Sequence, residues 1–125
     1  MIPLQNRKGG RRILVVEDEI LIGMLLEDML GDLGYEVAAT ASRVEDALAL
    51  ARDLEVDAAI LDVNLNGEDV YPVADVLAGR SIPFVFATGY GECALPDAYQ
   101  QRPTLQKPFE EATLARQLAQ LIGAP

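Results

Sequence analysis

The sequence predicts an α/β fold, with a five-stranded parallel sheet covered by helices on both faces in a doubly wound, three-layer α/β/α arrangement. Short apolar runs alternate with segments of helical period, which is typical of a parallel sheet. Polar residues follow four of these runs where a strand would end. Half of the 125 residues are hydrophobic, enough for one core but hardly for two. We therefore expect one compact domain.

Five apolar runs predict the strands of this sheet. They lie at 13–17, 35–40, 57–62, 82–87 and 103–106. Helical segments separate them, and a last helix is predicted near 110–122. The first 11 residues are basic and rich in Gly, Gln and Asn, so we expect residues 1–11 to be a flexible tail and residues 12–125 to form the domain.

The first helix is predicted over about 19–33, and two sets of apolar residues lie on it. One set forms a stripe for the core: Ile22, Leu25, Leu26, Met29 and Leu33. Ile20, Leu21 and Met24 lie away from that stripe. They are either scattered surface apolar residues, which are common, or a docking surface beside the site. The sequence leaves both interpretations open.

Local signals predict where other helices begin and end. Ser42 and Glu45 have the spacing of a capping box, and behind them an inward stripe is predicted: Val44, Leu48, Ala51 and Leu54. Gly34 and Gly79 are typical helix ends. Two glycines and a proline within 89–96 predict a short or frayed helix there.

Composition excludes several classes of protein. The chain has no His, which excludes a phosphohistidine carrier, a Ser-His hydrolase and a His-ligated zinc protein. From Ile13 onward six basic residues oppose 20 acidic ones, so nucleic acid is a poor partner. No apolar run is long enough for membrane insertion. Cys93 is the only cysteine, which fits a reducing cytoplasm.

The residues that follow four strands carry the chemistry. Glu17-Asp18 follow the first strand, Asp62 ends the third, Thr88 follows the fourth and Lys107 follows the fifth. Ligands of open α/β sheets bind at this edge. Clustered carboxylates there repel one another, so either one stays protonated or a cation joins them. Mg²⁺ fits, with Asp18 and Asp62 as direct ligands, Glu17 direct or through water, and the backbone carbonyl of Asn64.

These residues predict phosphoryl transfer to an aspartate. Asp62 would be the nucleophile, Lys107 would neutralise phosphoryl charge, and the Thr88 hydroxyl could donate a hydrogen bond. Lys107-Pro108 is a candidate for a cis peptide bond, which would aim the lysine inward.

Each signal also has an ordinary interpretation taken alone. Acidic residues before a helix often only cap it, and a lone Asp after a strand often forms a turn. The coincidence of four signals in a fixed order favours the site. Two rival functions remain, a phosphatase of the haloacid dehalogenase kind and a flavodoxin-like binding module. The first lacks the expected Asp-x-Asp on the first strand, and the second would repel phosphate with its acidic cluster.

At these residues the chain, from Arg12 to Ile122, resembles a response-regulator receiver domain of two-component signalling. The resemblance implies a flavodoxin-like sheet of order 2-1-3-4-5. It also implies Mg²⁺-dependent phosphoryl transfer from a histidine kinase to Asp62. Such a protein is a switch that catalyses only its own phosphorylation and dephosphorylation, and is not otherwise an enzyme.

Three departures from the family pattern narrow the subclass. Thr104 stands where an aromatic switch residue is usual, and Asn66 stands where proline is common. The segment Pro83–Tyr90 resembles the FATGUY receivers of alphaproteobacteria, often encoded with HWE-type kinases. We therefore expect a stand-alone receiver in which the switch comprises Thr88, Gly89, Tyr90 and Pro108. Its output would be a partner protein or a role as a phosphate sink or relay.

Overall fold

The computed structural model describes residues 11–89, 95–100 and 102–123. Five parallel strands form one sheet: β1 (Arg12–Val16), β2 (Glu36–Ala41), β3 (Ala58–Asp62), β6 (Phe84–Thr88) and β7 (Thr104–Gln106). Their order is β2-β1-β3-β6-β7, which confirms the predicted order 2-1-3-4-5. Each predicted strand is found, with its ends within two residues of those expected.

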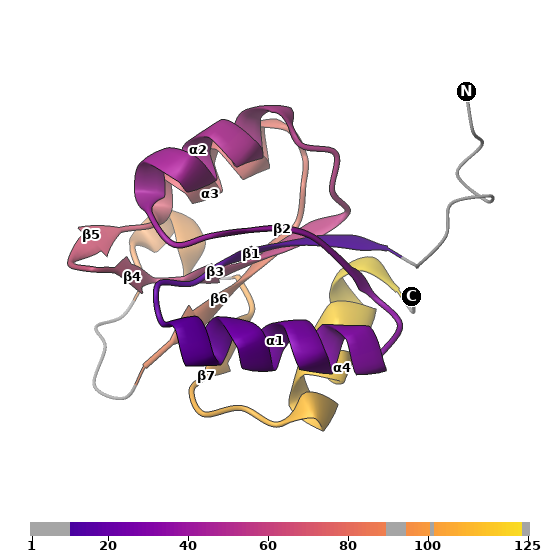
Figure 1. The fold of residues 1–125 in the computed structure, drawn as a ribbon. Helices are drawn as coiled ribbons and strands as arrows, with labels where there is room; N and C mark the ends of the chain where they lie inside the picture. Colours follow the sequence, from indigo (N-terminus) through magenta and orange to yellow (C-terminus); the bar gives the residue numbers. More distant parts are fainter. Residues whose placement is uncertain (1–10, 90–94, 101, 124–125) are drawn as a thin grey trace.

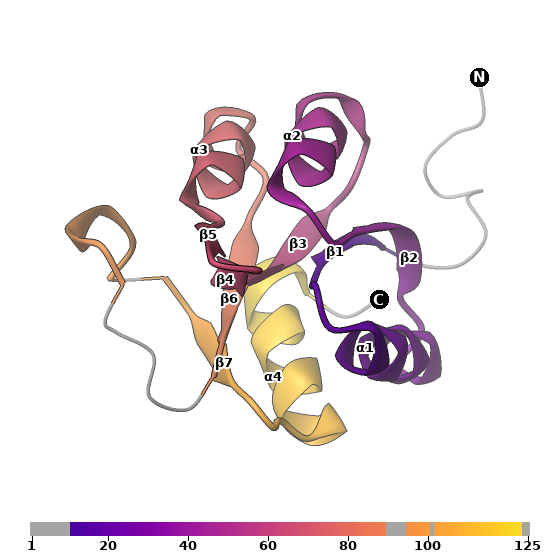
Figure 2. The same ribbon diagram turned by 60° about the vertical axis from the view of Figure 1, so that its left-hand side comes forward.

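Helices cover both faces of this sheet, as predicted. They are α1 (Ile20–Asp32), α2 (Val44–Asp53), α3 (Tyr71–Gly79) and α4 (Glu111–Ile122). In Figures 1 and 2, α2 and α3 lie on one face and α1 and α4 on the other. A short 3₁₀ helix, η2 (Asp97–Tyr99), precedes β7. Within the described ranges no helix has the length and apolar character needed to cross a bilayer.

The central strands are buried on both faces because their side chains alternate between two apolar layers. Leu14, Leu61 and Phe86 pack toward α2 and α3. Ile13 and Ile60 pack toward α1 and α4. The near-continuous apolar runs in the sequence follow directly from this double burial.

The predicted capping box at α2 is wrong. The N-cap residue is Arg43, and no side chain caps the helix. Ser42 therefore lies one position before the cap, where its hydroxyl cannot satisfy the first-turn amides. Glu45 instead forms an exposed ion pair with Arg43, with 2.5 Å between Oε1 and Nη2. In the α2 stripe Val44 and Ala51 are buried, as expected, together with Ala47, while Leu48 and Leu54 are only partly buried.

The predicted core stripe of α1 is partly wrong. Leu26 and Leu30 are the buried residues of this helix, whereas Leu25 is 47% exposed. Leu26 and Leu30 lie one turn apart on the same face, and Leu25 is rotated by about 100° from Leu26. The apolar residues therefore wrap further round the helix than the core needs.

The two predicted helix ends differ in detail. Gly34 follows α1 with φ 93°, a conformation that favours glycine, as a helix end requires. Gly79 is the last residue of α3, but the positive φ of 62° falls two residues later, at Ser81. Most of the predicted frayed helix at 89–96 lies outside the described residues, as does nearly all of the predicted tail 1–11.

A small hairpin that we did not predict follows β3. Strands β4 (Asn64–Leu65) and β5 (Glu68–Asp69) pair antiparallel. Asn66 and Gly67 connect them, with φ of 53° and 86°. An Asn-Gly pair is the preferred loop of a two-residue hairpin, so the sequence held this signal.

Candidate functional site

The candidate site lies at the carboxyl edge of the sheet. Asp62 is the last residue of β3 and Glu17 follows β1, and both are almost fully buried, with 3% and 7% exposed. The Glu17 amide continues the β1–β2 pairing by donating to the Ala41 carbonyl at 2.9 Å. Two carboxylates are thus brought together by neighbouring parallel strands.

Lys107 connects these two carboxylates. Its Nζ lies 2.8 Å from Glu17 Oε1 and 3.2 Å from Asp62 Oδ2. The Lys107 amide donates to the Thr88 carbonyl at 2.8 Å, which ties the end of β7 to the end of β6. The Lys107-Pro108 bond is cis. Burial alone would lower the pKa of Lys107, but the two carboxylates outweigh it and raise the pKa.

Asp62 is held in an environment that disfavours its negative charge. Burial raises its pKa most, and the neighbouring Glu17 raises it further, to about 8. Lys107 and the Asn64 amide, which donates to Asp62 Oδ1 at 3.2 Å, only partly oppose this. Further positive charge at the site would favour the carboxylate form that a nucleophile needs.

Asp18 differs from Asp62 because it is less buried and better solvated. Burial alone raises its pKa, but hydrogen bonds outweigh this and lower it, the largest contribution coming from the Asn66 amide. That amide donates to Asp18 Oδ2 at 2.9 Å. The Asn64 side-chain oxygen accepts from the Gly67 amide at 2.7 Å within the hairpin, and the Asn66–Asp18 bond holds the hairpin against the site.

The oxygen atoms of this cluster suit a hard divalent cation. One carboxylate oxygen each from Glu17, Asp18 and Asp62 lie within 4.8 Å of one another. Glu17 Oε1 is buried and lies 2.8 Å from the Lys107 ammonium. Carboxylate oxygens with no sulfur or imidazole donor among them are the set that Mg²⁺ prefers.

The structure brings four of the predicted site residues into one cluster, Glu17, Asp18, Asp62 and Lys107. Thr88 lies at the end of β6 and is joined to Lys107 through its backbone. Tyr90 lies outside the described residues. Sequence reasoning missed the amide of Asn66 as a partner of Asp18, although the Asn-Gly pair indicated a turn there.

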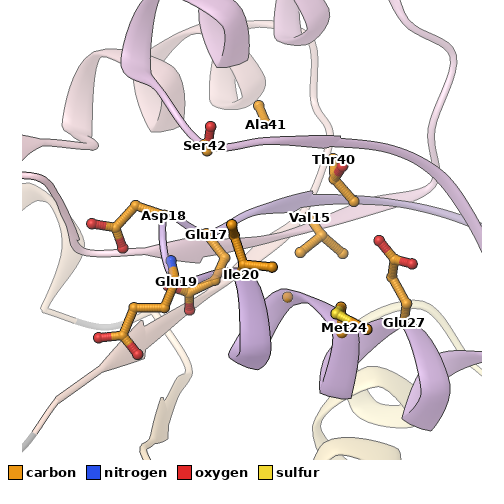
Figure 3. Close-up of a pocket in the computed structure, with 11 residues that line it drawn as sticks. Val15, Glu17, Asp18, Glu19, Ile20, Met24, Glu27, Thr40, Ala41 and Ser42 are labelled. Atoms are coloured by element: carbon orange, nitrogen blue, oxygen red, sulfur yellow. Dashed lines mark hydrogen bonds between the residues drawn. The ribbon is translucent and has the colours of Figure 1, made fainter.

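A groove adjoins the site between α1 and the end of β2 (Figure 3). The labelled carboxylates of Asp18 and Glu19 lie at one end of it and that of Glu27 at the other. Ile20 and Met24 line it and are 78% and 56% exposed, and the nearby Leu21 is 79% exposed. The predicted apolar set on α1 is therefore at the surface, next to the acidic cluster.

Comparison with known proteins gives a clear family match. The model of the response regulator receiver domain matches residues 13–119. The chain is 33% identical over 108 residues to the transcriptional regulatory protein PdtaR of Mycobacterium tuberculosis strain H37Rv. That alignment covers 83% of this chain and 53% of PdtaR, so the chain spans about half the length of that curated relative.

Solved structures agree with this match. SdrG from Sphingomonas melonis Fr1 is 50% identical, with a TM-score of 0.80 over 87% of this chain and 93% of SdrG. The BeF₃-activated conformation of SdrG gives a TM-score of 0.74 over 86% and 92%. The receiver domain of the sensor histidine kinase PA1611 from Pseudomonas aeruginosa, with magnesium in its active-site cleft, is 29% identical. Its TM-score is 0.76, over 92% of this chain and 99% of that one.

Proposed function

This chain belongs to the response regulator receiver domain family, and from that membership we propose that Asp62 accepts a phosphoryl group from a histidine kinase in a Mg²⁺-dependent reaction. Receiver domains are signalling switches that bind Mg²⁺ at an acidic pocket and take phosphate from histidine kinases.

The observation that carries the proposal is the contact of Lys107 with both Glu17 and Asp62 at the sheet edge. A lysine ammonium within 3.2 Å of a buried carboxyl oxygen can also contact the oxygens of a phosphoryl group bonded to that carboxyl. Mg²⁺ would be held by Glu17, Asp18, Asp62 and the Asn64 carbonyl. A bound ion supplies positive charge beside the transferring oxygens.

The transfer step follows from these positions. An Asp62 carboxylate oxygen attacks the phosphorus of a phosphohistidine, and the phosphorus–nitrogen bond of the donor breaks. The electron pair returns to the imidazole nitrogen, which takes up a proton. Lys107 and the Thr88 hydroxyl stabilise charge on the phosphoryl oxygens. Asp62 then carries an acyl phosphate, whose added charge biases the switch segment of Thr88, Gly89 and Tyr90, with Pro108 beside Lys107.

The output of the switch is proposed to be an interaction with a downstream protein, or a role as phosphate sink or relay.

The exposed apolar residues of α1 are the proposed docking surface for the kinase, which we expect to be of the HWE type. Ile20, Leu21 and Met24 lie directly beyond the acidic residues that follow β1. Lys107, Pro108 and Phe109 line a second groove with Leu25, on another side of the same helix. A kinase bound to the surface of Ile20, Leu21 and Met24 would present its histidine to Asp62.

The test is phosphoryl transfer from an autophosphorylated HWE-type kinase in the presence of Mg²⁺. The wild type should take up label, and Asp62→Asn should take up none. Asp53→Asn is the matched control, because it removes an exposed aspartate at the end of α2 and should be labelled normally. Label retained by Asp62→Asn would contradict the proposal, and catalytic turnover of simple phosphate esters would favour the phosphatase alternative.

A further inference from the structure

Thr104, the position of the usual aromatic switch residue, faces solvent at the start of β7. It pairs with Phe86 of β6, so in a parallel sheet the two side chains lie on the same face. Threonine is too small to cover the Phe86 ring. An aromatic residue from elsewhere in the chain does so instead.

That residue is Tyr99 of η2, which is 7% exposed. Its ring centroid lies 5.5 Å from that of Phe86 and 5.8 Å from that of Phe84, both edge-on. It also stacks on Tyr71 of α3, with centroids 6.0 Å apart and planes at 15°. Tyr99 therefore covers Phe86 on the face of the sheet that Thr104 shares.

A hydrogen bond holds Tyr99 in this place. Its hydroxyl donates to Oδ1 of Asp75 on α3, and its amide donates to the Pro96 carbonyl at 2.8 Å. The Arg102 guanidinium lies over the Phe84 ring, 4.6 Å from the centroid. Burial, followed by the neighbouring Asp75, raises the pKa of Tyr99 to about 12, so the hydroxyl keeps its proton at neutral pH.

The position of Tyr99 connects it with the phosphorylation site. Side chains alternate along β6, so Thr88 lies on the same face as Phe86, two residues beyond it. Tyr99 lies in the connection between Thr88 at the end of β6 and Lys107 after β7. If Thr88 moves toward a phosphoryl group on Asp62, the end of β6 moves with it, on the face where the Tyr99 ring packs on Phe86 and is held by Asp75 of α3.

We propose that Tyr99 is the positioning residue that holds the end of β6 in its unphosphorylated arrangement, and that phosphorylation of Asp62 is coupled to release of the Tyr99–Asp75 hydrogen bond. This inference rests on the proposed function. A hydrogen bond that forms only in the unphosphorylated state stabilises that state relative to the phosphorylated one. Its removal must therefore strengthen binding of a phosphoryl mimic by the factor with which the bond favoured the unphosphorylated state.

The test measures the affinity of beryllofluoride in the presence of Mg²⁺. Tyr99→Phe keeps the ring and loses the hydroxyl, and should bind the mimic about fivefold more tightly, since one hydrogen bond contributes on this scale. Asp75→Ala should give a similar gain, and the double variant should gain nothing beyond either single one. Asp75→Asn keeps the acceptor oxygen and should stay close to wild type.

Tyr35→Phe is the matched control. The Tyr35 hydroxyl donates to the Gly123 carbonyl at 3.3 Å, outside the Tyr99 cluster, so its loss should leave mimic affinity unchanged. A second readout is the Asp75 carboxyl carbon resonance, which should shift on mimic binding in wild type but not in Tyr99→Phe.

Two outcomes would overturn the inference, and a third would instead contradict the proposed function. Folded Tyr99→Phe with unchanged or weaker mimic binding would show that the bond is not specific to one state. A gain of equal size in Tyr35→Phe would show an unspecific effect of stability. Failure of the wild type itself to bind the mimic would instead contradict phosphorylation of Asp62.

Discussion

At the scale of single residues, Lys107 holds the site together because its ammonium contacts both buried carboxylates. The side chains of Glu17 and Asp62 are 2% and 4% exposed, and that of Lys107 is 15% exposed. Water therefore screens these charges little, and the lysine partly offsets the mutual repulsion of the carboxylates.

Lys107→Gln should destabilise the protein in the absence of Mg²⁺. Breaking a buried ion pair leaves uncompensated charge, and we expect a loss of about 3 kcal/mol in the free energy of unfolding. Arg43→Gln is the control. The side chains of Arg43 and Glu45 are 65% and 67% exposed, so loss of their ion pair should change the free energy of unfolding by less than about 1 kcal/mol. Urea unfolding of both variants would measure this, and equal losses would contradict the assigned role of Lys107.

Mg²⁺ should stabilise the wild type through Asp18. A ligand that binds only the folded state adds about 2.7 kcal/mol at 100 times its dissociation constant. Thermal unfolding should show a rise in Tm on titration with Mg²⁺, reversed by EDTA. Asp18→Asn should lose most of this rise, whereas Asp53→Asn should keep it. A full response in Asp18→Asn would remove Asp18 from the ligand set.

At the scale of elements, the strands were predicted well because their signal is simple. Residues buried on both faces form short, continuous apolar runs, and the turns between them are polar. Helix α1 was harder, since apolar residues surround much of it. Periodicity alone could not separate Leu26, which packs on the sheet, from Leu25, which lines a groove beside Pro108.

Two leucine variants in α1 test this distinction. Leu26 is 1% exposed, so Leu26→Ala should cost about 2–5 kcal/mol of stability. Leu25 is 47% exposed, and Leu25→Ala should cost less than about 1 kcal/mol. Met24 belongs to the proposed docking surface and is 56% exposed, so Met24→Ala rather than Leu25→Ala should slow phosphoryl transfer from the kinase. Equal stability losses in chemical denaturation would contradict the assigned burial.

The β4–β5 hairpin was missed because its strands are only two residues long, below the length at which alternation is visible. Gly67 has φ 86°, and a side chain there is strained although no atom lies within 4 Å. Gly67→Ala should therefore cost about 1–2 kcal/mol. Gly23→Ala, in α1 with equal space, should instead stabilise the protein by up to about 1 kcal/mol. Urea unfolding would measure both variants. If the free energy of unfolding changed in the same direction in both, this explanation of the loop would be contradicted.

At the scale of the whole molecule, the order of the strands and the position of the site are connected. The sheet order brings the ends of β1, β3, β6 and β7 to one edge, and each predicted site residue follows or ends one of these strands. The sequence predicted this edge because strand ends can be read from apolar runs. It could not predict the hydrogen bond between the Asn66 amide and Asp18, since 48 residues separate the two.

The sequence shows Thr104 in place of an aromatic residue, but it does not show that Tyr99 packs on Phe86. That contact depends on how η2 packs against α3 and β6, and no local pattern reports a contact between distant elements.

We expect Asp62, alone among the 20 acidic residues, to become an acyl phosphate. Borohydride reduces an aspartyl phosphate to homoserine, and peptide mass spectrometry then identifies the residue that was modified. After reaction with a phosphorylated histidine kinase and Mg²⁺, homoserine should be found at position 62 and should be absent when EDTA is added. Homoserine at any other position, or none while the kinase loses its phosphate to this chain, would contradict the account.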